Sequence, residues 1–528
     1  MVRMDAFAHI KIDVPNETIA ELWNQRASRF ADKTYLHFRE RAWSYAEMNH
    51  TAEKAAGLLK SLGAEKGEHV AVLLPNSPEF LFLWFGAMKG GFTAVTINTL
   101  LKAEELAYII DDCDARILVT TPPFRKLLEP VLPRLNKLQH IVLTEPDSQY
   151  ADAKVLPAAL EKSEPFVAEE LTRNDKASMI YTSGTTGHPK GVILSHGNIL
   201  YNSYVTHQLI ELQENDTALC IMPLFHVNAQ IASMMSTLWA GASVVLEDGF
   251  KPRSFISILK QYRCTTFSGV PTIYNFLNGM KEAEGEDLSF LKACICGAAP
   301  MPVEVFNTFE QKFKGKIVEG YGLSEGTCVS SLNPLRGKRK IGSIGLAIPG
   351  QEMRIVNARV DGQNLFLPDG EIGEIVIRGP NVMQGYYKKE NATRSTIIDG
   401  WLHTGDLGYR DSEGYFYITG RKKEMIIQGG ENIYPKEIEE VLYRLEGVSE
   451  CAIVGIPDAK YGEVVGAFII PKEGASITAA DVRTYLRDKI ANYKMPKVIE
   501  FVESFPKTAT GKIQKNRIVE SYTKRGAR

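Results

Sequence analysis

The sequence predicts an α/β protein with a large N-terminal domain, a small β-rich subdomain and a small C-terminal α+β domain. Short apolar runs alternate with longer helical patterns up to about Gly337. Short strands with frequent glycine follow, and the last hundred residues have the order strand, helix, strand, strand, helix. Alternation of strands and helices is typical of parallel sheets that helices cover on both faces.

The apolar runs of the first part have the length and composition of buried strands. The run at residues 69–76 precedes a helical pattern that Gly90 and Gly91 end. Residues 252–263 begin with proline, which suits the first turn of a helix. Further strands are predicted within residues 116–121, 140–145, 243–248, 265–271, 292–300 and 316–322.

The pattern changes after Gly337. Glycine-rich strands at residues 342–356 and 370–380 predict a small distorted β-barrel. A strand, a charged turn and another strand follow within residues 414–435, and then a helix at residues 436–445. We place the domain boundary in the charged turn near Arg421 and Lys423, which divides the chain into residues 1–421 and 422–528.

The composition favours a globular enzyme. The chain has 528 residues, 44% apolar and 23% charged, so two or more domains are expected. The formal net charge is −2 and no long basic block occurs, which argues against nucleic acid as a partner. The seven scattered cysteines predict buried free thiols. Neither a signal peptide nor a membrane-spanning run is recognised, so we expect a cytoplasmic protein.

The stretch YTSGTTGHPKG, residues 181–191, has the composition of a phosphate-binding loop. Glycines let backbone N–H groups turn toward an anion, hydroxyls donate hydrogen bonds, and a lysine adds positive charge. The loop is not a Walker A motif, because His188 and Pro189 separate Gly187 from Lys190. A plain surface turn is the alternative, and this density of glycine and hydroxyl residues makes it less favoured.

Together with four later segments, this loop resembles the signature of the adenylate-forming superfamily, which includes acyl-CoA synthetases. The later segments are GYGLSEG (residues 320–326), WLHTGD (401–406), GRKKEMIIQGGENIYPKEIE (420–439) and PKTATGKIQK (506–515). They occur in the family's order and cover most of the chain. The resemblance implies that a carboxylate and ATP form an acyl-adenylate and pyrophosphate, after which a thiol attacks to give a thioester.

The resemblance also implies residue roles. Lys512 bridges the carboxylate and the α-phosphate during adenylation, which needs mainly charge stabilisation. Glu325, with Thr185, holds Mg²⁺ against the phosphates. Tyr321 stacks on adenine, and Asp406 accepts hydrogen bonds from the ribose hydroxyls. Arg421 supports the same ribose or phosphate region. Without the family context, each of these residues has an ordinary structural explanation, such as an exposed charge or a core aromatic ring.

Further residues are assigned to the ATP or CoA sites through the same resemblance. Residues 182–186 grip the β- and γ-phosphates, Lys190 supports that loop, and the two glycines of IIQGGEN leave room for the pantetheine arm of CoA. The full set is Thr182, Ser183, Gly184, Thr185, Thr186, Lys190, Gly297, Ala298, Ala299, Gly322, Ser324, Gly429 and Gly430.

Two positions depart from the commonest family pattern. Ser324 stands where many members have Thr, and its hydroxyl keeps the hydrogen-bonding capacity. Lys423 stands at the family's hinge, where many members have Asp. The resemblance implies that the C-terminal lid domain rotates about Lys423, withdraws Lys512 after adenylation and presents another face for thiol attack.

The segment MPLFHVNAQ, residues 222–230, resembles the segment that lines the acyl pocket in the family, so it indicates the class of the substrate acid. His226 is expected near the substrate carboxylate as a gate or wall. Amino-acid-activating members place Asp after Phe, whereas His226 follows Phe225 here, so an amino acid is disfavoured. Apolar neighbouring segments favour a fatty acid. Asn228 and Gln230 leave open a polar acid, such as a carnitine-type or dicarboxylic one.

We therefore expect a fatty acid–CoA ligase that uses ATP, Mg²⁺ and free CoA, because no carrier domain follows the lysine segment. Two alternatives stay open. One is a ligase for an aryl or polar acid, or an enzyme that loads a separate carrier protein. The other is a nucleotide-binding protein without activity. A homodimer is expected from the resemblance alone.

Overall fold

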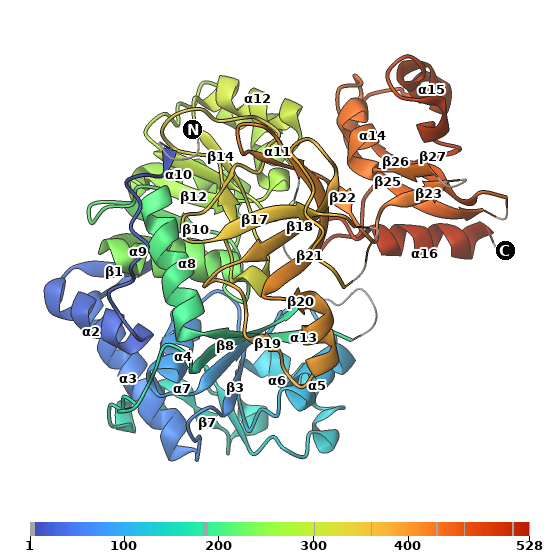
Figure 1. Ribbon diagram of the computed structural model, residues 1–528. Coiled ribbons are helices and arrows are strands. Elements are labelled where there is room, and N and C mark those ends of the chain that lie inside the picture. Colours follow the sequence, from blue (N-terminus) through green and yellow to red (C-terminus); the bar gives the residue numbers. More distant parts are fainter. Residues whose placement is uncertain are drawn as a thin grey trace.

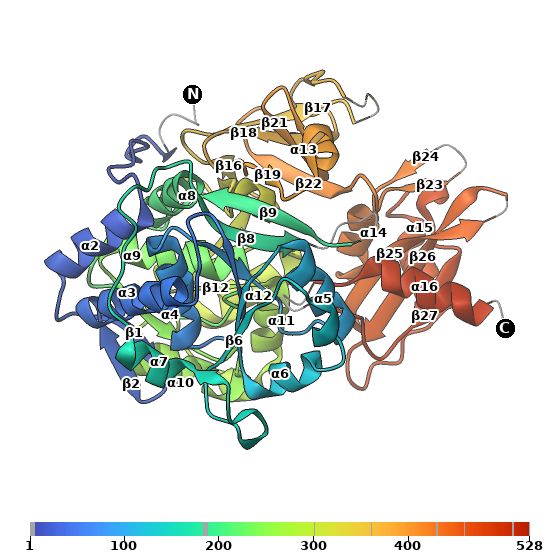
Figure 2. The same ribbon diagram turned by 90° about the horizontal axis from the view of Figure 1, so that it is seen from below.

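The computed structural model describes residues 6–182, 188–299, 301–358, 360, 362–428, 431–458, 460–508 and 512–526. Two large sheets and one small sheet form the N-terminal part, and a fourth sheet belongs to the C-terminal part. The two ribbon views place the C-terminal part at one side of the molecule, next to β22 (Figures 1 and 2).

The first large sheet has eight strands in the order β19-β9-β8-β4-β3-β5-β6-β7. Strands β8, β4, β3, β5, β6 and β7 run parallel, and β9 and β19 add antiparallel pairs at one edge. The strands are β3 (His69–Leu73), β4 (Thr93–Thr96), β5 (Ile117–Thr120), β6 (His140–Leu143), β7 (Lys154–Val155), β8 (Lys176–Thr182), β9 (Lys190–Ser195) and β19 (Gly385–Tyr386).

The second large sheet has nine strands in the order β16-β15-β14-β13-β12-β10-β11-β1-β2. Its central strands, from β14 to β1, are parallel. The strands are β1 (Thr34–Phe38), β2 (Arg41–Ser44), β10 (Thr217–Cys220), β11 (Ser243–Leu246), β12 (Thr266–Gly269), β13 (Ala293–Cys296), β14 (Ile317–Tyr321), β15 (Ser331–Leu332) and β16 (Leu346–Ala347). Strands were predicted at the positions of β3, β5, β6, β11, β12, β13 and β14, and all are confirmed.

Helices cover both large sheets, as the alternating pattern predicts. Helix α4 (Pro78–Lys89) contacts β3, β4 and β8 of the first sheet and is buried along its whole length, as its continuous apolar sequence requires. The other helices are α2 (Ile19–Arg29), α3 (Tyr45–Ser61), α5 (Ala103–Asp112), α6 (Pro122–Leu128), α7 (Leu156–Lys162), α8 (His196–Leu209), the π-helix η3 (Asn228–Met235), α9 (Ser236–Ala240), α10 (Pro252–Gln261), α11 (Pro271–Gly279) and α12 (Val303–Phe313).

The segment after Gly337 is β-rich, as predicted. It forms a five-stranded antiparallel sheet in which β18 and β21 pair at the centre. The strands are β17 (Glu352–Val356), β18 (Gly373–Arg378), β20 (Ile397–Ile398), β21 (Trp401–Arg410) and β22 (Phe416–Arg421), and helix α13 (Glu390–Thr396) lies between β19 and β20.

The C-terminal part has hydrophobic cores of its own, formed by described residues from Ile426 onward. Its elements are β23 (Ile426–Gln428), β24 (Glu431–Ile433), α14 (Pro435–Leu442), β25 (Val448–Asp458), β26 (Gly462–Pro471), α15 (Ala479–Arg487), β27 (Val498–Phe501) and α16 (Lys515–Gly526). The predicted strand and helix order is present, and β27 and α16 extend it. Strand β22 ends at Arg421 and the first residue of these cores is Ile426, and the division at residues 421 and 422 stays a prediction.

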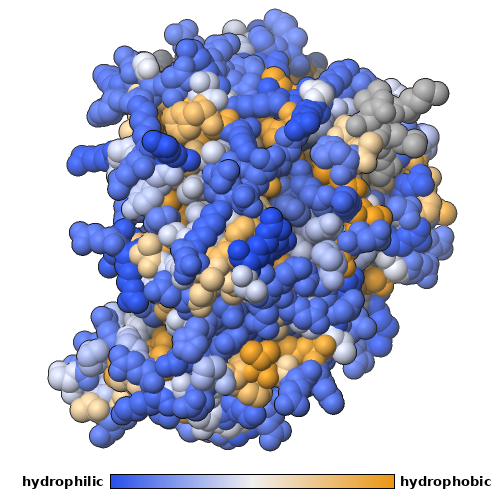
Figure 3. Space-filling view, turned by 90° about the vertical axis from the view of Figure 1, so that its left-hand side faces the viewer, coloured by the Kyte–Doolittle hydropathy of each residue, from blue (hydrophilic) through white to orange (hydrophobic). Residues whose placement is uncertain are grey.

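The surface is largely polar on the face that Figure 3 presents, with apolar groups in separate places. Within the described ranges, no helix combines the length and the apolar character that crossing a bilayer would require. The seven cysteines are free and buried, which confirms that prediction.

His196, the first residue of α8, is buried where an acid-sensitive hydrogen bond forms. Its Nδ1 accepts a hydrogen bond from the backbone N–H of Ile19 at 3.2 Å, which only the ring with an unprotonated Nδ1 can do. Burial lowers the pKa of His196 from 6.5 to about 4. The unfolded chain therefore binds the proton more readily, and stability present above pH 6.5 is lost as the pH falls toward 4.

We expect His196→Asn to reduce the acid sensitivity of unfolding, because the Asn oxygen can accept the same hydrogen bond without binding a proton. The full shift corresponds to about 3 kcal/mol of unfolding free energy. The measurement is the difference in thermal midpoint between about pH 7 and about pH 5. His50→Asn, at an exposed position, is the matched control. An equal loss of midpoint in wild type and His196→Asn would contradict this role for His196.

Candidate active site

A cavity lies between the N-terminal sheets and the C-terminal part. Residues of both contribute to its wall: the loop after β13, the ends of β14 and β22, the middle of β21, helix α14 and the segment around Lys512. Among the predicted site residues, Ala298, Ala299, Tyr321, Gly322, Asp406, Arg421 and Lys512 line this cavity. Residues far apart in the sequence thus meet around one space.

Asp406 is the centre of a hydrogen-bonded group in this cavity. The Tyr321 hydroxyl donates to Asp406 Oδ2 at 2.6 Å, and Arg421 Nε lies 2.8 Å from Asp406 Oδ1. Asp406 and Arg421 are direct partners across the antiparallel pair of β21 and β22, so the sheet register brings them together. The carboxylate of Asp406 raises the pKa of Arg421, and burial followed by the proximity of Asp406 raises the pKa of Tyr321.

Lys512 faces this group from the C-terminal part. Its backbone N–H donates to Thr508 Oγ1 at 3.1 Å, and its carbonyl accepts from the backbone N–H of Thr508 at 2.8 Å. Burial, and next the positive charge of Arg421, lower the pKa of Lys512 below its usual 10.5, although Glu424 and Asp406 oppose that shift. An amine held beside another cation in a buried site is suited to binding an anion that enters between them.

Glu325 lies in the short helix Ser324–Gly326 and is held by two hydroxyls. Its Oε1 accepts hydrogen bonds from Thr182 Oγ1 at 3.3 Å and from the Tyr386 hydroxyl at 2.9 Å. Lys190 Nζ lies 4.9 Å from the centre of the Tyr386 ring. One polar cluster therefore contains Glu325 and Tyr386 together with Thr182 and Lys190, which lie on either side of the predicted phosphate loop.

Position 322, between Tyr321 and Glu325, has no room for a residue larger than glycine. A Cβ atom at this position would lie 1.3 Å from the carbonyl oxygen of Cys328. The close approach of the two backbone segments fixes the loop that carries Glu325.

Two other predicted residues, Gly297 and Lys423, lie next to residues that line the cavity, and six lie outside the described part of the chain. Gly297 follows β13 and precedes the cavity-lining alanines. Lys423 lies in the turn after β22, where burial, followed by Lys190 and Arg421, lowers its pKa. The predicted residues Ser183, Gly184, Thr185, Thr186, Gly429 and Gly430 lie outside the described residues.

His226 lies apart from the residues that line this cavity, in the loop between β10 and η3. Its ring contacts Phe225 with a centroid distance of 4.6 Å, and burial lowers its pKa to about 4. Within the described part of the chain, His226 Nε2, Asn228 Oδ1 and Gln230 Oε1 are buried without a hydrogen-bond partner. A neutral imidazole and two amide groups thus carry unused polar atoms in the segment predicted to bind the acid.

Sequence reasoning missed Glu319 and Tyr386. Glu319 precedes Tyr321 by two residues in β14, so both side chains point to the same face of the strand, and Glu319 also lines the cavity. Burial raises the pKa of Glu319 to about 7. The alternation of side chains along β14 could have identified it. The contact between Tyr386 and Glu325 joins residues 61 apart in the sequence, and no local pattern predicts it.

Comparisons with known proteins identify the family of this chain. The family described as AMP-binding enzyme matches residues 23–387, and the AMP-binding enzyme C-terminal domain matches residues 437–512. A long-chain-fatty-acid–CoA ligase of Bacillus subtilis is 36% identical over 97% of this chain and 96% of its own length. A feruloyl-CoA synthase of Amycolatopsis sp is 34% identical over 94% of this chain and 97% of its own length.

The fold also matches solved structures. The crystal structure of an anthranilate CoA ligase in complex with anthranoyl-AMP superposes with a TM-score of 0.90 at 29% identity, and the match covers 99% of this chain and 100% of that one. The acids named for these three proteins are aliphatic in one case and aromatic in two.

Proposed function

Since the chain belongs to the AMP-binding enzyme family and is an AMP-forming acid–CoA ligase, we propose that its acid is a fatty acid. In this proposal the enzyme forms acyl-AMP with release of pyrophosphate and then transfers the acyl group to CoA. The observation that carries the reaction class is that Asp406, Arg421 and Lys512 all line one cavity. Free CoA as acceptor, a homodimeric state and a cytoplasmic location are parts of the same proposal.

The nucleoside part of ATP would bind on the N-terminal side of the cavity. Asp406 would accept hydrogen bonds from both ribose hydroxyls, because a carboxylate has several acceptor positions. The Tyr321 ring would lie against adenine, with the backbone of residues 297–299 and Gly322 along the base. Arg421, already paired with Asp406 at 2.8 Å, would hold that carboxylate in its orientation.

The phosphates would lie toward Glu325 and the loop that begins at Thr182. Mg²⁺ in proteins is usually bound by one or two carboxylates together with phosphate oxygens. The carboxylate of Glu325 supplies such oxygen ligands, and its Oε1 is held in place by two hydroxyls, so this residue fits the ion. When bound, Mg²⁺ neutralises phosphate charge. Lys190, near Tyr386, would support the loop, and Ser324 and the predicted ligand Thr185 would complete the phosphate contacts.

Lys512 would neutralise the charge that develops between the carboxylate and the α-phosphate. Its buried position near Arg421 leaves two cations around the space where the attacked phosphate would lie. For the second step, the C-terminal domain would rotate about Lys423 and remove Lys512, while Gly429 and Gly430 would leave room for pantetheine.

The fatty acid would extend away from the phosphates past His226. Support comes from Met222, Leu224 and Phe225 of this segment, which are buried in the main hydrophobic cluster, and from the fatty-acid ligase of Bacillus subtilis among the relatives. Burial keeps His226 neutral at physiological pH, since its pKa is about 4, so it would act as a wall or hydrogen-bond partner and not as a cation.

ATP–pyrophosphate exchange tests this proposal when it is measured with a panel of acids: long- and medium-chain fatty acids, an aryl acid and a dicarboxylic acid. Mass spectrometry of the CoA thioester then identifies the product. We expect the highest kcat/KM with a fatty acid. A higher kcat/KM with the aryl or dicarboxylic acid would contradict the substrate class. Failure of every acid in the panel to support exchange would contradict the activity.

A further inference from the structure

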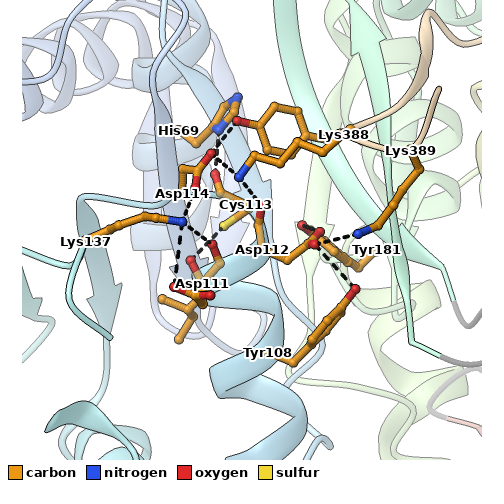
Figure 4. Close-up of polar contacts among 12 residues, drawn as sticks. His69, Tyr108, Asp111, Asp112, Cys113, Asp114, Lys137, Tyr181, Lys388 and Lys389 are labelled. Atoms are coloured by element: carbon orange, nitrogen blue, oxygen red, sulfur yellow. Dashed lines mark hydrogen bonds and ion pairs between the residues drawn. The ribbon is translucent and has the colours of Figure 1, made fainter. Parts of the chain in front are cut away.

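The C-terminal end of helix α5 carries negative charges that destabilise the helix. Asp111, Asp112 and Asp114 cluster at its C-terminal end, where the helix macrodipole disfavours negative charge. Lysines from two distant segments surround them: Lys137 on one side, and Lys388 and Lys389 on the other (Figure 4). The cluster lies outside the cavity described above, so its role requires another explanation.

Asp112 holds the chain just before the predicted phosphate loop. Its Oδ2 accepts a hydrogen bond from the Tyr181 hydroxyl at 2.8 Å, and its side chain is only 11% exposed. Tyr181 is followed directly by Thr182, whose hydroxyl donates to Glu325. Burial, followed by the proximity of Cys113 and Asp112, raises the pKa of Tyr181, so that its hydroxyl remains a donor.

His188, on the other side of the loop, also contacts helix α5. The His188 ring stacks on Tyr108 with a centroid distance of 4.4 Å and an interplanar angle of 19°. Tyr108 precedes Asp112 by four residues, so both side chains lie on one face of α5, and the Tyr108 hydroxyl lies 3.4 Å from Asp112 Oδ1. Tyr181 and His188, which flank residues 182–187, are thus both supported by the C-terminal half of α5.

A third segment joins this support to Glu325. Lys389 Nζ lies 3.0 Å from Asp112 Oδ1, and the Tyr387 hydroxyl donates to Asp114 at 2.7 Å. The preceding residue, Tyr386, points the other way and donates to Glu325 at 2.9 Å. The backbone N–H of Tyr387 also donates to the carbonyl of Gly191, which directly follows Lys190.

We propose that Asp112 is a positioning residue for triphosphate binding. Through Tyr181 and Tyr108 it fixes the described residues that flank the phosphate loop, and through Lys389 it fixes the segment that carries Tyr386, the tyrosine that orients Glu325. Asp112 itself does not contact the nucleotide. The inference rests on the proposed function, because ATP is the ligand whose phosphates this loop and Glu325 would bind. The unfavourable charge at the end of α5 is then a consequence of this role.

Three substitutions test the inference: Tyr181→Phe removes one hydroxyl, Lys389→Met removes one cation, and Asp112→Asn removes the carboxylate charge. Calorimetric titration with Mg²⁺ and ATP measures affinity without any acid, and steady-state kinetics give separate KM values for ATP, acid and CoA. We expect ATP affinity to fall by about 5- to 10-fold in Tyr181→Phe, because a hydrogen bond to a charged group is lost at a residue that acts on the nucleotide only indirectly, and by more in Asp112→Asn.

Controls separate positioning from a general loss of structure. Asp111→Asn changes a neighbouring carboxylate that is 56% exposed and lies 3.8 Å from Lys137, and it should leave ATP affinity unchanged. Lys389→Arg should keep most of the ATP affinity that Lys389→Met loses. KM values for the acid and CoA should change by less than about 2-fold, since neither substrate would contact the phosphate loop.

The possible results are distinguishable. Unchanged ATP affinity in Tyr181→Phe and Lys389→Met would overturn the inference, and so would equal increases in all three KM values. If Asp112→Asn does not fold, those two milder variants decide. A wild-type protein that does not bind ATP would contradict the proposed function, whereas normal binding by wild type and by all variants would contradict only the role of Asp112.

Discussion

Lys512→Ala is expected to lower ATP–pyrophosphate exchange by about 1,000-fold or more, because it removes a preorganised charge from the transition state of adenylation. Thioester formation from supplied acyl-adenylate and CoA should remain within about 5-fold of wild type, because Lys512 would be withdrawn in that step. The two half-reactions are measured separately, by exchange of labelled pyrophosphate and by mass spectrometry of the thioester.

The contrast between the two half-reactions is what makes this substitution informative. Lys512 lines the cavity and its pKa is lowered by burial and by Arg421, so its replacement by alanine also relieves a repulsion and should not unfold the domain. Lys524→Ala, at an exposed position of α16 in the same part of the chain, is the control and should keep both activities. Equal losses in both half-reactions would contradict a model in which the C-terminal domain uses two positions.

The elements of the fold could be predicted from local patterns, and their arrangement could not. The strand runs and helix ends at β3, α4 and β11 follow from apolar runs, glycine and proline, which act over a few residues. The order of strands in the two large sheets depends on pairing between distant segments, such as β1 with β11 and β19 with β9. No local signal fixes those pairings.

In the candidate site, too, the residues could be predicted from local motifs and their contacts with one another could not. Motif resemblance identified Tyr321, Asp406, Arg421 and Lys512, and the structure brings all four to one cavity. Their mutual contacts depend on the register of β21 with β22 and on the position of the C-terminal part. Asp112 was missed because it lies in an ordinary helix end whose importance arises only when β8 and residues 387–389 meet it.

Asp406→Asn is expected to impair both half-reactions, in contrast to Lys512→Ala. The ribose of ATP and of the acyl-adenylate would bind the same carboxylate, so loss of its charge weakens the nucleotide in each step. Hydrogen bonds to charged groups contribute about 1.5–3 kcal/mol each, so we expect kcat/KM for ATP to fall by about 100-fold. Thioester formation from supplied acyl-adenylate should fall by a similar factor.

Part of that loss has a second origin, because Arg421 is paired with Asp406 at 2.8 Å and would lose its anionic partner. Tyr321→Phe separates the two contributions: it removes the hydroxyl that donates at 2.6 Å and leaves the ion pair in place. This variant should lose about 10-fold in kcat/KM for ATP, at the low end of the range for one hydrogen bond to a charged group. A thermal midpoint near the wild-type value in Asp406→Asn would assign its defect to nucleotide binding. Activity of Asp406→Asn within about 3-fold of wild type would contradict a ribose-binding role, since even one charged hydrogen bond contributes more than that.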